Sequence, residues 1–127
     1  MAVGLTSFQA QAFLTSLPAT VYVKLHKNSP GPDPGAAGAT SPSVETTRKA
    51  VTLAAASGGT RSASTQPSWT SWTAGTETIS HISIWDTVGP TGGNCLWTGA
   101  LSSSKTVSNG DTLTLTSLSF SLTPLAA

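Results

Sequence analysis

The sequence predicts an all-β protein: an antiparallel β-sandwich of about seven short strands, jelly-roll or immunoglobulin-like, with a short N-terminal helix and a long Pro/Gly loop. Several short segments alternate apolar and polar residues, which is the period of a strand with one buried face. Turn signals separate these segments at intervals of about 8–12 residues, as in sandwiches. Only 9% of the residues are charged, too few for a coiled coil or a long solvated helix.

The 127 residues have the length of a single domain. Within it we expect an N-terminal contact segment, residues 1–19, followed by the β-sandwich, residues 20–127. The one cysteine, Cys95, excludes an intrachain disulfide. The first 23 residues carry no charge, but polar residues interrupt them and no positive region precedes them. We therefore expect neither a signal peptide nor a membrane-spanning helix, and no membrane partner.

Residues 6–17 form the expected helix. Thr6 and Gln9 have the spacing of a capping box, and Pro18 ends the helical pattern. An apolar stripe at helical spacing is predicted to pack on the edge or end of the sheet. The alternative is a binding role, for which Phe8 and Phe13 are candidate partner contacts. The stripe consists of Leu5, Phe8, Ala12 and Phe13, widened by Leu14 and Leu17.

Residues 20–26 predict a half-buried strand. Apolar residues occupy one face, and polar residues, including Lys24 and His26, occupy the other, which places His26 in solvent. The Pro-rich loop 28–43 follows, because proline lacks the N–H that a β-ladder needs. Long loops of this kind are often functional, so Pro32, Asp33 and Pro34 are candidate partner contacts.

The strand pattern resumes at Arg48, a further candidate partner contact, with Val51 and Leu53 on one face. Residues 57–60 have the composition of a hairpin turn, and residues 60–66 are expected to return as a polar edge strand. Residues 78–86 carry apolar side chains on both faces, which predicts a central strand covered on both sides.

The C-terminal part predicts a strand over residues 95–101 and a hairpin turn at residues 108–111, where Ser-Asn-Gly-Asp is the strongest turn signal of the chain. In residues 112–122 the apolar positions change from odd, as in Leu113, to even, as in Phe120. A regular strand cannot turn both sets to one core. We therefore expect a bulge or kink near residues 116–117 that lets this segment serve two sheets.

The residues that carry chemistry form no recognisable active site. His26 and His81 lie in separate strand patterns, whereas a zinc site needs three or four ligands. Glu77 and Asp86 lie about 30 Å apart at opposite ends of one strand, too far for paired-carboxylate hydrolysis. Cys95 is expected in the core. We expect no enzyme, metal or cofactor, and six scattered cations predict no nucleic-acid partner.

The four tryptophans fall into two groups. Trp85 and Trp97 lie in well-defined strands and are expected in the core. Trp69 and Trp72 lie in a Ser/Thr-rich segment, and two alternatives are open for them. They either cover the end of the sandwich, or they are exposed and stack on sugars or anchor an interface, where tryptophan is enriched. Both are candidate partner contacts.

Six segments resemble a family of small structural proteins of tailed bacteriophages, especially those that infect actinobacteria. In that family a Val-x-Leu-His strand leads into an Asp-Pro-Gly loop, an Arg-x-Ala-Val segment, a run of small residues and a His-x-x-x-Trp strand. The resemblance covers roughly residues 20–122. The similar segments are residues 21–26, 33–35, 45–52, 55–59, 81–86 and 99–101.

The resemblance implies a virion component that is assembled in the host cytoplasm. The first hypothesis is a capsid decoration (cement) protein, trimeric, that binds the phage major capsid protein on the outer surface of the head. The alternative is a minor tail or tail-fibre protein, whose partners would be other tail proteins or a host surface glycan. Low charge favours a chain that packs against copies of itself, because symmetric contacts repeat one surface.

Overall fold

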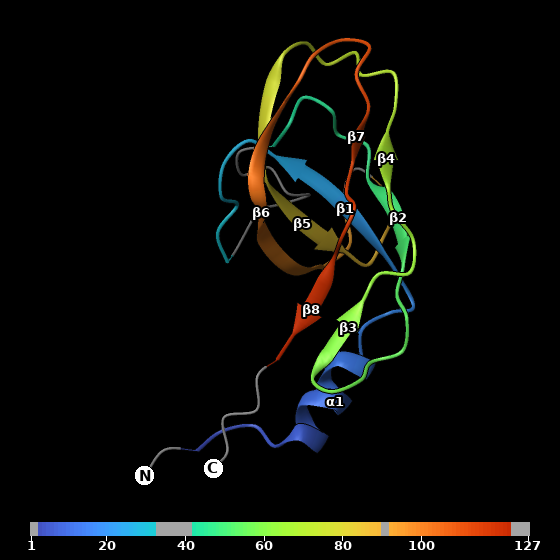
Figure 1. The fold of residues 1–127 in the computed structure, drawn as a ribbon, viewed down its shortest axis with the longest axis vertical. Coiled ribbons are helices and arrows are strands. Elements are labelled where there is room, and N and C mark those ends of the chain that lie inside the picture. The colour runs from blue at the N-terminus through green and yellow to red at the C-terminus, as the bar shows by residue number, and fades with distance from the viewer. Residues whose placement is uncertain (1–2, 33–41, 90–91, 123–127) are drawn as a thin grey trace.

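A computed structural model describes residues 3–32, 42–89 and 92–122. It confirms an all-β fold with one short helix at the N-terminus (Figure 1). All of the strand pairs in the described residues are antiparallel. The elements are α1 (Ser7–Thr15), β1 (Thr20–His26), β2 (Lys49–Thr52), β3 (Thr60–Ser62), β4 (Ser68–Trp69), β5 (Glu77–Trp85), β6 (Cys95–Val107), β7 (Leu113–Thr114) and β8 (Ser119–Ser121).

The main sheet has four strands in the order β2-β1-β5-β6. β5 is an inner strand, paired with β1 on one side and β6 on the other. Ile82 and Ile84 on one face of β5 and Ser83 and Trp85 on the other are all buried, which confirms a strand covered on both sides. Because both faces of β5 are covered, its position in the sheet is strongly fixed.

Two small sheets, β3–β8 and β4–β7, lie over one face of the main sheet (Figure 1). The C-terminal segment contributes one strand to each of them, β7 and then β8, with residues 115–118 between. This break confirms the kink expected near residues 116–117. The core between the layers includes Val23, Ile84, Trp69 and Phe120.

The two predicted turns have different outcomes. Residues 57–60 close a hairpin, since the N–H groups of Ser57 and Thr60 each donate to the carbonyl of the other, at 2.8 and 3.0 Å. The turn at residues 108–111 also forms, with Asp111 N–H donating to Ser108 O at 3.0 Å. However, its arms do not pair: β6 is bonded to β5, and β7 is bonded to β4.

The second face of β1 is buried, so the prediction of a solvated His26 is wrong. His26 is fully buried, and its Nε2 lies 2.7 Å from Ser83 Oγ. The returning chain covers the end of β1, where Pro42 forms a β-bridge with His26 and Ser43 N–H donates to Leu25 O at 3.0 Å. Alternation alone cannot reveal such a cover, because the covering segment is distant in sequence.

Cys95, which was expected in the core, is only partly buried.

α1 begins and ends close to its predicted limits. Thr6 is the N-cap, and its hydroxyl accepts a hydrogen bond from Gln9 N–H at 3.2 Å. The buried Arg61 on β3 fastens the other end by donating to Leu14 O at 3.0 Å and Leu17 O at 2.7 Å. A cation at this position satisfies carbonyls that the helix leaves free and complements the helix dipole.

Candidate interaction surface

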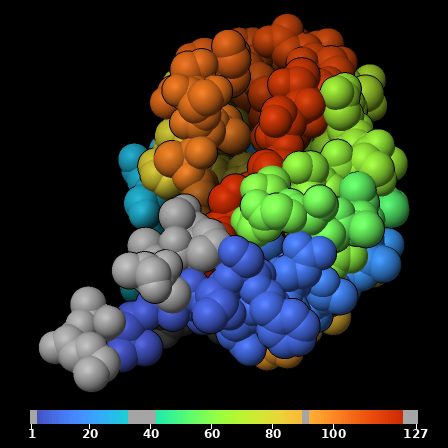
Figure 2. All heavy atoms as spheres, turned by 60° about the horizontal axis from the view of Figure 1, so that its bottom comes forward, coloured from blue at the N-terminus to red at the C-terminus, as the bar shows by residue number. Residues whose placement is uncertain are grey.

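The N-terminal segment exposes four large apolar side chains. Phe8 is 82% exposed and Phe13 is 51% exposed, and Val3 and Leu5, which precede them in the chain, are exposed as well. We call these four residues the N-terminal apolar surface. Figure 2 shows α1, in blue, on the outside of the molecule.

α1 packs on the core with only part of the expected stripe. Leu14 and Leu17 of the stripe are buried, together with Ala10 outside it, whereas Phe8 and Phe13 are exposed. The helix therefore has apolar residues on two sides. The hydrogen bonds from Arg61 to Leu14 O and Leu17 O join the C-terminal end of the helix to β3.

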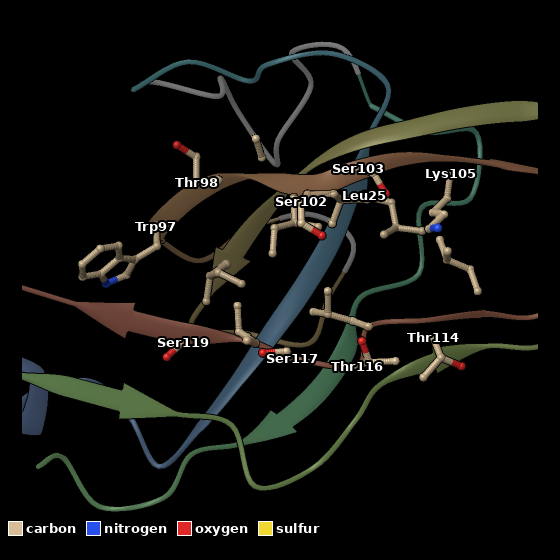
Figure 3. A pocket seen from close by; sticks show the side chains of 18 of the residues that line it. Leu25, Trp97, Thr98, Ser102, Ser103, Lys105, Thr114, Thr116, Ser117 and Ser119 are labelled. Atoms are coloured by element: carbon tan, nitrogen blue, oxygen red, sulfur yellow. The ribbon is translucent and has the colours of Figure 1, made fainter.

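A second feature is a slot of about 370 Å³ between β6 and the C-terminal segment (Figure 3). Its floor includes Leu25, Ile82 and Ile84 of the main sheet. Hydroxyl side chains form both rims, and Lys105 is the only charged residue that lines it in the described part of the chain. The rim hydroxyls are Thr98, Ser102 and Ser103 on β6, and Thr114, Thr116, Ser117 and Ser119 opposite.

The abundant serine and threonine form exposed cross-strand pairs. Thr78 and Thr106 hydroxyls lie 3.0 Å apart, and Ser68 and Thr114 hydroxyls lie 2.8 Å apart. Such pairs satisfy polar groups without introducing charge. The serine and threonine residues therefore form a polar surface that carries no charge.

Arg48 is buried, and it bonds the connection between β5 and β6. Its guanidinium lies 4.1 Å from the centre of the Trp85 ring, and Nη1 donates to Thr87 O and Gly92 O, both at 3.1 Å. Nε and Nη2 have no hydrogen-bond partner in the described structure. Burial lowers the pKa of Arg48. Burial also lowers the pKa of Lys24, and the positive charge of Arg48 lowers it further.

A model of the family described as podophage GP4 fiber I protein gp80 matches residues 6–123. The chain belongs to this family. No curated protein matches it. Membership of the gp80 family identifies a phage structural protein with a place in the virion, which confirms that part of the resemblance.

The candidate partner contacts of this gp80-family chain lie in different environments. Phe8, Phe13 and Pro32 are exposed, and both phenylalanines lie on α1. Arg48 is buried. Asp33 and Pro34 lie outside the described residues.

Trp69 and Trp72 belong to the core, which decides between the two alternatives left open for them. They are 2% and 1% exposed, and their Nε1 groups donate to Thr47 O at 3.0 Å and to Gly75 O at 2.8 Å. Neither ring is available to stack on a sugar.

The slot was not foreseen from the sequence, because it depends on long-range pairing. Within the described residues, no helix has the length and apolar character needed to cross a membrane.

Proposed function

We propose that this protein is a structural subunit of a phage tail fibre, without catalytic activity, and that it associates with copies of itself through the N-terminal apolar surface. The family description supports the fibre over the capsid surface as its location. No tryptophan-based glycan site is included, because Trp69 and Trp72 are buried.

The observation that carries this proposal is the helix with two apolar sides. A helix on the surface of a protein normally turns its large apolar residues toward the core. α1 buries Leu14 against its own core and leaves Phe8 and Phe13 outside. Covering a side chain of this size contributes about 1.5–3 kcal/mol. Each copy in a symmetric assembly makes the same contact, so the contribution is repeated.

The low charge of the chain agrees with self-association. The N-terminal segment up to residue 23 has no charged residue, and the formal net charge of the whole chain is +1. Copies that meet through this segment bring no like charges together. A net charge near zero also gives little repulsion between subunits.

Substitution of the two exposed phenylalanines tests the contact. We expect Phe8→Ser with Phe13→Ser to convert an oligomer into a monomer, measured by light scattering coupled to size-exclusion chromatography, with an unchanged circular dichroism spectrum. The matched control is Val44→Ser with Val88→Ser, since these valines are also exposed but lie elsewhere. The same measurement gives the copy number, for which three is the sequence-based expectation. A monomeric natural protein would overturn the proposal.

Immunogold labelling of intact virions tests the location. We expect label on the fibres at the tail. Label distributed over the faces of the head would instead establish the capsid decoration hypothesis and overturn the fibre assignment.

A further inference from the structure

The turn at residues 108–111 connects β6 to the segment of β7 and β8, and these two arms are not paired with each other. β6 is bonded to β5 along one edge, while β7 and β8 are bonded to β4 and β3. Among the described residues, no strand pairs with the outer edge of β6 or with the edge of β7 and β8 that faces it. The slot lies between these two free edges (Figure 3).

The ends of the slot are fixed by contacts within the subunit. At one end, the rings of Trp97 and Phe120 meet edge to face with their centres 5.1 Å apart. At the other end, Trp72 holds the turn: its N–H donates to Asp111 O at 3.0 Å, and its carbonyl accepts from Gly110 N–H at 2.8 Å. These contacts hold the arms apart at a set separation, so the slot is part of the fold.

The pairing of β6 with β5 is also interrupted in the middle of the strand, where several β6 residues have no partner residue on β5. Ile79 is paired with Lys105 and His81 with Ala100, so residues 101–104 of β6 lie opposite the single residue Ser80. These β6 residues line the slot or stand next to it. Free strand edges over an apolar floor are the features by which proteins accept an added peptide strand.

The N-terminal arm, residues 3–6, has the chemistry that this slot would accept. The arm precedes α1, and Thr6 has extended backbone angles, φ −78° and ψ 163°. Val3 and Leu5 are exposed and two positions apart, so in an extended chain both side chains point to the same side. The arm has no charged residue, and Lys105 is the one charged residue among the described residues that line the slot, so seating the arm there would cover at most this one charge.

The arm of the same subunit does not occupy the slot. The residues that line it come from positions 25 to 120, and none belongs to residues 3–17. We propose that the slot receives the N-terminal arm of a second copy, with Val3 and Leu5 on the apolar floor and the arm backbone bonded to β6. This deepens the proposed function and rests on it. A contact between two different surfaces of identical subunits closes into a ring when the rotation allows.

Site-specific cross-linking tests the proposal in the full-length chain with Cys95→Ser. One copy carries Val3→Cys, and a differently tagged, co-expressed copy carries Ser117→Cys on the rim of the slot. We expect a disulfide-linked heterodimer on a non-reducing gel, at least about tenfold more abundant than in a control pair of Val3→Cys with Val88→Cys, because a seated arm raises the local thiol concentration. Leu5→Asp in the arm should abolish this excess, since it places a charge on the apolar floor.

The outcomes separate the two proposals. Heterodimer at the level of the control, in a protein that is oligomeric by light scattering, overturns the slot inference and leaves self-association through α1 intact. Predominant pairing of Val3→Cys with itself also overturns it, because the arms then meet each other. A protein that is monomeric at every concentration overturns both.

Discussion

The paired centre of the main sheet and the splayed arms around the slot are built in opposite ways. β1 and β5 have neighbours on both edges and buried residues on both faces. β6 has one free edge and mostly exposed residues, although it is the longest strand described. The chain thus pairs the strands of one part on both edges, whereas in the described residues the other part keeps an unpaired edge. Three tests probe the main sheet, the slot and the loop that joins β5 to β6.

Tryptophans on adjacent strands provide the largest test. Trp85 on β5 is 2% exposed, stacks under Arg48 and donates from Nε1 to Ser83 Oγ at 2.7 Å. Trp97 on β6 is only partly buried. We expect Trp85→Ala to lower the free energy of unfolding by about 3–5 kcal/mol. Trp97→Ala should lower it by about 1 kcal/mol.

Urea denaturation of both variants measures this difference. Equal losses would mean that the arms around the slot are as firmly packed as the centre of the sheet, which would contradict the comparison.

A pair of serines gives a smaller effect. Ser83 is buried, and its hydroxyl bonds both His26 Nε2 and Trp85 Nε1 at 2.7 Å. Ser83→Ala leaves these groups without that partner, and we expect a loss of about 1–3 kcal/mol by urea denaturation. Ser103→Ala, on the exposed rim of β6, is the matched control and should change stability by less than about 0.5 kcal/mol. A neutral Ser83→Ala would show that the centre tolerates an open hydrogen bond.

The smallest effect concerns the connection between β5 and β6. Asp86 accepts from Asn94 N–H at 2.8 Å and from Asn94 Nδ2 at 3.0 Å. The Asn94 backbone N–H, and next its side chain, lower the pKa of Asp86 below the ordinary 3.8. This contribution to stability is therefore complete above the ordinary pKa, and it is lost as the pH falls through the lowered pKa.

Comparison of Asp86→Asn with the natural protein at about pH 7 and about pH 2 measures this contribution by urea denaturation. We expect the natural protein to be the more stable at the higher pH and the difference to shrink at the lower one. A difference that is the same at both pH values would exclude the Asp86 carboxylate as its source.

The parts of the fold that local pattern dictates were predictable from the sequence. Thr6 caps α1 because its hydroxyl reaches an N–H three residues away, and the turn at residues 57–60 depends on its own composition. The burial on both sides of β5 follows from apolar residues on both its faces. The apolar phase change at residues 113–120 likewise indicated a break between two sheets.

Features that depend on distant segments were not predictable. His26 is buried because the chain returns at Pro42, and Trp69 is buried because β7 pairs beside it. The orientation of α1 was ambiguous, since Leu14 and Phe8 mark two apolar sides and the segments that cover Leu14 are distant in sequence. For the candidate site, Phe8 and Phe13 were found from residue type, but the slot requires knowledge of which edges remain unpaired.

The exposed hydroxyl pairs have a consequence for the conditions in which copies associate. Dissolved salt screens interactions between charges over a distance of about 10 Å at 0.1 M ionic strength, but it does not screen apolar contacts or neutral hydrogen bonds in this way. The N-terminal apolar surface has no charged residue, and pairs such as Ser68 with Thr114 are neutral. We therefore expect that raising the ionic strength from dilute buffer to about 0.1 M does not weaken the affinity between copies.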